Sequence, residues 1–302
     1  MARRGHGAWV ALAGAVVLGW MEPASATGVA GDRLFPATLL IEDTQNDDEI
    51  ALPTVSYLRR GANGDTPAGR DLAISTEFAR LLTPDLSVLI DTGWHRLSTS
   101  GATQHGWDNL NVGLKYRTIV SEPDEFLLST ALIYEIGGTG AARIGAERAD
   151  SVQPVVSFGR GFGDLSHDLE WLRPAAVTGA LGVSIPTAGG TATTVHYGAS
   201  LQYSLIYRDQ HTGLPTPDWA TALVPLIEFA VDTPAGRSYG TYTTATAAPG
   251  IAWIGDKMQL TAEALVPLNS HTGRGVGVIA QVHLFLDELM PAVFGKPLFA
   301  GD

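Results

Sequence analysis

Cysteine is absent from the 302 residues of this chain, and charged side chains are scarce, at 17% of the total. The first absence excludes disulfides, thiolate metal sites and cysteine-based catalysis. Positive charge is the scarcer kind, because 19 Lys and Arg stand against 31 Asp and Glu, for a net charge of −12. Such a chain lacks the basic surface that nucleic-acid binding requires. The composition is typical of an exported protein without disulfides, and we expect neither a cofactor nor a nucleic-acid partner.

Long apolar runs are also missing beyond the N-terminus, so no later segment could span a membrane as a helix. The N-terminus itself carries Arg3 and Arg4, then a short apolar run over residues 8–20, then small residues at positions 24–26. This order predicts a cleaved secretory signal peptide over residues 1–26. If the mature chain lies in a membrane, it must span it as a closed barrel, which satisfies every backbone hydrogen bond.

The stretch 109–135 shows the unit that the rest of the chain repeats. Residues 110–116 place Leu, Val, Leu and Tyr at every second position, with polar or small residues between them. The polar turn 121–124 follows, and residues 126–134 alternate again. Period-two alternation on both sides of a tight turn predicts a hairpin whose strands are long enough to cross a bilayer.

Twelve such strands can be placed, which predicts an all-β, antiparallel, up-and-down transmembrane β-barrel. Their expected ranges are 52–60, 70–82, 85–97, 108–120, 124–136, 150–160, 169–185, 194–208, 220–232, 241–254, 257–268 and 274–287. Short connections should alternate with longer loops, although the connection 209–219 is long on the short side. Lipid-facing aromatic residues are expected near both ends of the strands, Trp171 and Tyr207 among them.

Residues 27–50 show no steady period and end in the acidic run 42–49. Two interpretations stay open for them, a periplasmic lead-in or a segment tucked into the lumen as a partial plug. The run lacks the glycine and the distal glutamate of an EF-hand loop, so no metal site is expected. Residues 51–302 should form the outer-membrane barrel with a short C-terminal tail.

The polar phase of the strands predicts which side chains line the lumen. The candidates are Asp71, Glu77, Asp91, Lys115, Arg117, Glu135, Glu228, Glu263, Gln281 and His283. We expect Glu77, Asp91, Glu228 and Glu263 to lie near mid-strand, facing Lys115. Acids outnumber bases in this set, so an open lumen would favour cations or neutral solutes over anions. A barrel of this size could also be filled by its own side chains.

Catalysis has only a weak signal, in His95 and Ser98. These residues are three apart on one strand, so their side chains point to opposite faces, whereas a nucleophile and its base must be within hydrogen-bond reach. We therefore expect no enzyme and no catalytic residues, with an outer-membrane lipid hydrolase as the alternative.

Several stretches of the chain carry a resemblance, among them GDRLFPAT (31–38), LPTVSY (52–57), GGTGAARIG (137–145), GFGDL (161–165) and GVGVIAQVHLFLDELMP (275–291). They resemble a group of proteobacterial outer-membrane barrel proteins, similar to the transporter family associated with the meta-pathway of phenol degradation. The resemblance implies a barrel in the outer membrane of a Gram-negative bacterium and supplies no binding residues. The chain departs from the usual aromatic closing residue, because it runs on past the last strand to residue 302.

Together these observations predict passive diffusion of small solutes, apolar or aromatic compounds among the candidates, through an acidic lumen. A closed structural barrel with binding loops is a further alternative. The expected partners are outer-membrane lipid, small solutes, the barrel-assembly machinery and periplasmic chaperones. The oligomeric state cannot be derived from these patterns.

Overall fold

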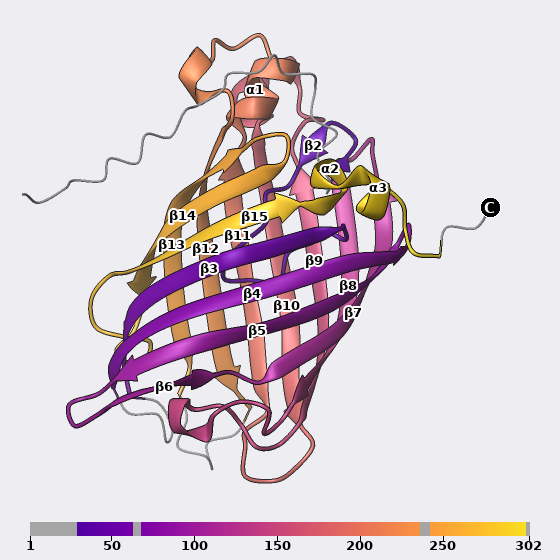
Figure 1. Ribbon diagram of the computed structural model, residues 1–302. Coiled ribbons are helices and arrows are strands. Elements are labelled where there is room, and N and C mark those ends of the chain that lie inside the picture. Colours follow the sequence, from indigo (N-terminus) through magenta and orange to yellow (C-terminus); the bar gives the residue numbers. More distant parts are fainter. Residues whose placement is uncertain (1–28, 63–67, 236–241, 300–302) are drawn as a thin grey trace, which may run out of the picture.

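The computed structural model describes residues 29–62, 68–235 and 242–299. The signal peptide expected over residues 1–26 lies outside this part of the chain. Twelve long antiparallel strands form the wall of a closed barrel (Figure 1). They are β3 (Glu49–Arg60), β4 (Gly69–Thr83), β5 (Leu86–Ser98), β7 (Leu110–Ser121), β8 (Phe126–Ile136), β9 (Ser151–Gly161), β10 (Ala175–Pro186), β11 (Thr194–Tyr203), β12 (Leu223–Pro234), β13 (Thr244–Ile254), β14 (Met258–Pro267) and β15 (Gly277–Phe285).

Closure comes from pairing between the first and last strands of the wall. Each strand pairs with its neighbours in sequence, and β15 returns to pair with β3, with Ala280 opposite Val55. The twelve-stranded antiparallel barrel expected from the sequence is therefore confirmed. One stretch differs from the expectation. Residues 103–107, expected in a loop, form the short strand β6 (Thr103–Trp107), which pairs with the C-terminal part of β5.

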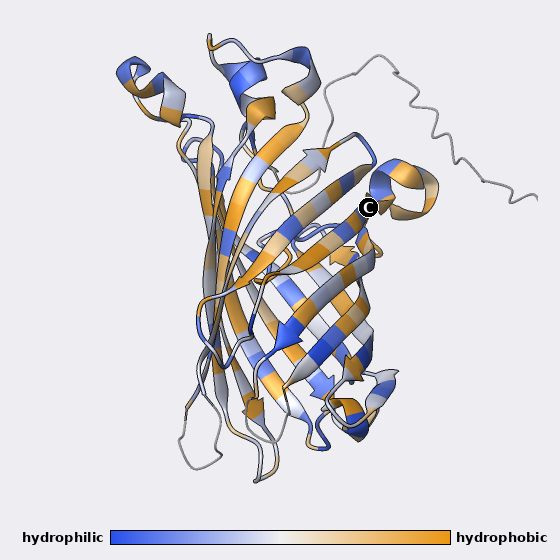
Figure 2. Ribbon diagram, turned by 90° about the vertical axis from the view of Figure 1, so that its left-hand side faces the viewer, coloured by the Kyte–Doolittle hydropathy of each residue, from blue (hydrophilic) through white to orange (hydrophobic). Residues whose placement is uncertain are grey.

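The wall is apolar outside and polar inside, the reverse of a water-soluble protein. Leu132 is 55% exposed on the outer face, whereas Lys115 is 1% exposed and Glu228 fully buried on the inner face. Figure 2 shows apolar and polar residues alternating along the strands. Period-two alternation places one kind on each face of a pleated strand, and the exposed apolar face fits a lipid surround.

The two ends of the barrel differ. One end, here called the turn end, has tight connections at 84–85, 122–125 and 255–257. The other end, here called the loop end, carries longer connections such as 137–150 and 268–276. The last strand runs toward the turn end, where the helices α1 (Leu205–His211), α2 (Leu286–Leu289) and α3 (Pro291–Phe294) also lie (Figure 1).

Two expected strands were too long. Residues 167–172 form a 3₁₀ helix, and β10 starts only at Ala175, after Pro174, which cannot donate a ladder hydrogen bond. Strand β11 ends at Tyr203 because Ser204 caps α1, accepting from the Tyr207 N–H at 3.1 Å. Trp171 and Tyr207 are thus helical, and Tyr207 is buried rather than lipid-facing. The long connection at the turn end is a real enlargement that holds α1.

No helix in the described ranges is long and apolar enough to cross a membrane.

Candidate functional site

The inside of the barrel holds a part of the chain that precedes its first wall strand. Residues 35–48, here called the lumen segment, hydrogen-bond inward-facing side chains of β5, β7, β8, β9, β12 and β14. Contacts with strands on all sides of a closed wall are possible only from within. The segment therefore crosses the interior before the chain joins the wall at Glu49.

The chain is fixed at the turn end before it passes inside. A short hairpin of β1 (Val29–Ala30) and β2 (Arg33–Leu34) precedes the lumen segment. Arg33 is completely buried, donates to Glu125 Oε2 at 3.0 Å and to the Pro174 carbonyl at 3.0 Å, and lies 3.8 Å from the centroid of the Tyr207 ring. Burial lowers the pKa of Arg33, and the Glu125 carboxylate opposes that effect. A buried guanidinium with several hydrogen-bond partners holds the β1–β2 hairpin in one position against the turn end of the barrel.

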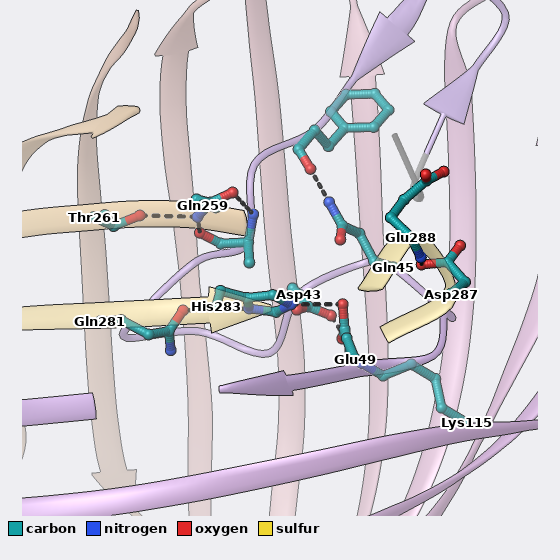
Figure 3. Close-up of polar contacts among 12 residues, drawn as sticks. Asp43, Gln45, Glu49, Lys115, Gln259, Thr261, Gln281, His283, Asp287 and Glu288 are labelled. Carbon is teal, nitrogen blue, oxygen red and sulfur yellow. Dashed lines mark hydrogen bonds and ion pairs between the residues drawn. The ribbon is translucent and has the colours of Figure 1, made fainter. Parts of the chain in front are cut away.

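Wall side chains satisfy the backbone of the lumen segment, which has no regular secondary structure of its own. The Leu39 and Leu40 N–H groups each donate to the Glu228 carboxylate at 2.8 Å. Gln259 accepts from the Ala37 N–H at 3.1 Å and donates to the Ala37 carbonyl at 2.9 Å (Figure 3). Buried backbone groups need such partners, so these contacts allow an irregular chain to be buried here.

One buried lysine of the wall forms ion pairs with two acids of the lumen segment. Lys115 Nζ lies 2.7 Å from Glu42 Oε1 and 2.8 Å from Asp43 Oδ1. Burial raises the pKa of the Asp43 carboxyl, while the nearby Lys115 ammonium acts in the opposite direction. The expected facing of Lys115 toward wall acids is thus replaced by pairing with two acids of the lumen segment.

Small hydroxyl side chains make room for the segment. Ser129 Oγ donates to the Thr44 carbonyl at 2.8 Å, Ser157 Oγ donates to the Asp43 carbonyl at 2.9 Å, and Ser87 Oγ donates to Asn46. All three serines are buried on the inner face. A larger side chain at any of them would occupy the volume that the segment fills.

The base of the segment is acidic and lies beside β15 and α2. Burial, and then the Glu49 charge, raise the pKa of Asp47 well above the usual carboxyl value. Asp47 Oδ2 has no hydrogen-bond partner among the described residues. Glu49 accepts from His283 Nε2 at 2.8 Å (Figure 3). Of the two neighbouring acids, Glu49 is thus in an ion pair.

Two of the cavities in the described part of the barrel that lie beside residues 38–43 of the segment are large enough for a small solute. The larger, here called the acidic cavity, has a volume of about 240 Å³, and Glu42, Asp43, Glu77, Asp91 and Gln281 are among its lining residues. Glu77 and Asp91 face each other across the β4–β5 pairing. Two carboxyl groups of the wall and two of the segment thus line this cavity, and Lys115 is paired with the two of the segment.

The smaller, here called the mixed cavity, has a volume of about 190 Å³. Leu40, Ile41 and Val155 supply apolar surface, and the His196–Asp232 pair, with its 2.7 Å contact, supplies polar groups. Ala180, Gly182, Gly198 and Ala230, on the facing strands β10, β11 and β12, also line it. These short side chains leave the space that larger ones would fill.

The structure brings some of the expected lumen residues together and separates others. Glu77, Asp91 and Gln281 share the acidic cavity, while Lys115 and Glu228 hold the lumen segment. Glu263 is also buried, and its two carboxylate oxygens have no hydrogen-bond partner among the described residues.

The remaining members lie elsewhere on the inner wall. Arg117 is near the turn end, 3.1 Å from Asp85. Asp71 pairs with Arg60 and His95 toward the loop end, and Glu135 accepts from Asn109 Nδ2 at 2.6 Å. His283 pairs with Glu49 as described above.

Sequence reasoning missed the residues that fix the segment at its two ends, Arg33 and Arg80. Arg80 Nη1 lies 2.6 Å from Asp48 Oδ2. It also missed the three serines, although a row of serines on the polar phase of long strands was a usable signal. Such small inner residues need something else to fill the lumen.

The weak catalytic signal does not form a catalytic pair. His95 Nδ1 lies 3.2 Å from the Asp71 carboxylate, whereas Ser98 Oγ lies 3.2 Å from Thr103 Oγ1. A base and nucleophile would need to contact each other. The described residues hold no group of three or more His, Asp or Glu side chains arranged to bind a metal ion.

Comparison with solved structures places the fold in a known class, the outer-membrane β-barrels. The chain is similar to an outer membrane channel from Pseudomonas putida F1, with TM-score 0.54, 13% identity, and coverage of 83% of this chain and 99% of that one. The NanC porin (TM-score 0.46, 6% identity, 77% and 98% coverage) and the KdgM porin (0.43, 9%, 76% and 98%) are more distant. No protein-family model and no curated protein matches the sequence.

Proposed function

We propose that this protein is a channel of the Gram-negative outer membrane that passes small solutes by diffusion, with the lumen segment as its constriction. The observation that carries the proposal is a polar, partly filled lumen inside an apolar outer wall. The turn-end half is occupied by residues 35–48, and cavities of about 240 and 190 Å³ lie against the segment. A side-chain-filled structural barrel would not need a separate segment to fill it.

Charge supports a preference for cations and neutral solutes. Glu42, Asp43, Glu77 and Asp91 line the acidic cavity, and the one lysine nearby is already paired with two of them. Fixed charges of one sign in a narrow, low-dielectric passage attract counter-ions and repel ions of the same sign. Anions should therefore pass less readily than cations of the same size.

The mixed cavity supports apolar or aromatic solutes as the second class. A cavity of about 150 Å³ lined by aliphatic side chains is large enough for benzene, and this one measures about 190 Å³. Leu40, Ile41 and Val155 would contact the hydrocarbon part, while His196 and Asp232 would hydrogen-bond a polar substituent. Transport needs no cofactor and no covalent step.

The test is ion current through the mature protein refolded into a planar bilayer, with the reversal potential measured across a salt gradient. We expect small cation-selective steps, and a loss of selectivity when Glu77→Gln and Asp91→Asn are combined. The control combines Glu170→Gln and Asp256→Asn, which remove two acids from turn-end connections outside the wall strands. A folded barrel that carries no current, with or without the lumen segment, would contradict the proposal.

A further inference from the structure

After β15 the chain leaves the wall and runs along the turn end of β4. Residues 286–299, here called the C-terminal tail, include α2 and α3. The N–H groups of Leu298 and Phe299 donate to the carbonyls of Leu81 and Leu82 at 3.0 and 2.8 Å. Because β3 begins only opposite Ala79, β4 extends beyond its neighbour there. The tail pairs with this unoccupied edge of β4.

The tail lies on the outside of the barrel. The Phe294 ring packs edge-on against Phe78, with centroids 6.4 Å apart. Phe78 is four residues from Ile74, on the same outward face of β4, and Ile74 is exposed to the surroundings of the barrel. The contact therefore joins the tail directly to the apolar outer surface of the wall.

A single arginine fixes this position. The Arg80 guanidinium donates to the Val293 carbonyl at 2.9 Å and to the Lys296 carbonyl at 3.1 Å, and lies 4.7 Å from the centroid of the Phe294 ring. The same group binds Asp48 at the base of the lumen segment. The tail thus has a defined placement, coupled to the point where the chain leaves the lumen.

The side of the tail that faces away from these contacts is apolar. Val293 is 61% exposed and Phe299 69% exposed, and Met290 and Leu298 are exposed beside them. Large side chains of this kind are unfavourable in water, at roughly 25 cal/mol for each Å² of apolar surface left exposed. Four exposed apolar side chains on a fixed segment at this position call for a covering partner.

We propose that the C-terminal tail is a membrane-interface anchor whose exposed apolar side chains contact the lipid of the leaflet at the turn end. Continuity with the lipid-facing wall through Phe78 and Phe294 favours lipid over a protein partner, because the same lipid already surrounds the neighbouring outer face of β4. The backbone of the tail is partly paired with β4, which allows it to approach the apolar region. The proposal rests on the outer-membrane location proposed above.

Nitroxide labels can test this directly, because the chain has no cysteine and each single-cysteine variant carries one label. Val293→Cys and Phe299→Cys report on the tail. Leu132→Cys, on the outer wall, is the lipid control, and Thr187→Cys, in a loop-end connection, is the aqueous control. The full mature chain is reconstituted in phosphatidylcholine–phosphatidylglycerol vesicles, and collision rates with oxygen and with a water-soluble nickel chelate are compared.

We expect the oxygen-to-nickel ratios of both tail labels to lie closer to that of Leu132→Cys than to that of Thr187→Cys. Ratios equal to that of Thr187→Cys would overturn the anchor, as would spin–spin broadening that shows a second copy on the tail. An aqueous ratio at Leu132→Cys itself would instead contradict the membrane barrel. Heat-dependent gel mobility checks that each variant is folded, and the two tail positions serve as independent readings.

Discussion

The two halves of the lumen differ although one wall encloses both. Toward the turn end, Ser129 and Ser157 contact the lumen segment, and the interior is occupied by that segment. Beyond the segment, short residues such as Ala180 and Gly182 face a cavity. Ser157 and Ala180 are direct partners across the β9–β10 pairing, so the boundary between the filled part and the cavity runs between these two strands.

This comparison shows that the wall strands alone do not decide how open the barrel is. Small inner residues leave space in both places, and a separate part of the chain fills it in one of them only. Twelve strands give a barrel between those that are filled by side chains and those that are open.

Lys115→Met should give the largest loss of stability. It leaves Glu42 and Asp43 without their cation in a buried site, which typically costs about 3–5 kcal/mol. Arg117→Met is the matched control, because Arg117 is two residues along the same face of β7 and its ion pair with Asp85 is less buried, with side chains 25% and 51% exposed. That change should cost less than about 1 kcal/mol. Urea unfolding in detergent measures both, and equal losses would contradict a special role for Lys115.

Ser157→Leu and Ala180→Leu test the difference in filling between two facing residues. The first inserts a large side chain against the lumen segment and should destabilise the barrel by about 1–3 kcal/mol through overpacking. The second points toward the mixed cavity and should leave stability nearly unchanged while reducing ion current. If Ala180→Leu is as destabilising as Ser157→Leu, the mixed cavity cannot accept a leucine side chain, and the difference in filling is contradicted. Thermal unfolding midpoints and single-channel current report the two effects.

Asp47→Asn should have the smallest effect, with a defined pH dependence. The pKa of Asp47 is raised well above its usual value by burial, so the wild-type protein binds this proton more tightly when folded. The contribution of the Asp47 carboxyl to the free energy of unfolding is fully present below the unfolded carboxyl pKa of about 4. It is lost as the pH rises through the raised pKa of the folded state. The Asp47→Asn variant has no carboxyl at this position and so does not lose this stability as the pH rises. The difference in thermal unfolding midpoint between the variant and the wild type should therefore be near its lowest in acid and grow in favour of the variant toward alkaline pH. A constant difference at every pH would exclude Asp47 as the cause.

Much of the fold could be predicted because period-two alternation is a strong signal when repeated twelve times. Residues 110–116 and 126–134 are found as β7 and β8, nearly at the expected boundaries. The errors came where capping and proline chemistry overrides alternation, at Pro174 and at Ser204. Pro174 delays the start of β10 and Ser204 ends β11, and alternation alone does not carry that information.

Less of the candidate site could be predicted. The polar phase identifies Glu228 and Lys115 as inward-facing, but it cannot say what each one contacts across the lumen. Glu42 and Asp43 lie more than 70 residues before Lys115 in the sequence. Their stretch shows no hydrophobic periodicity, so both a periplasmic lead-in and a lumen plug remained open as interpretations. Pairing of this kind depends on the closed wall, which brings residues from distant strands to one interior.

The central claim is that residues 35–48 constrict an otherwise passable lumen, and the most direct test is single-channel conductance with and without them. A mature chain that begins at residue 48 should fold and give a conductance roughly tenfold or more above that of the full mature chain, since twelve strands then enclose an emptier passage. Replacing Leu39, Leu40, Ile41 and Glu42 by glycine gives a second variant that keeps the Arg33 and Asp48 contacts, and it should raise conductance by a smaller factor. Unchanged conductance in both folded variants would contradict a constriction of the lumen by residues 35–48.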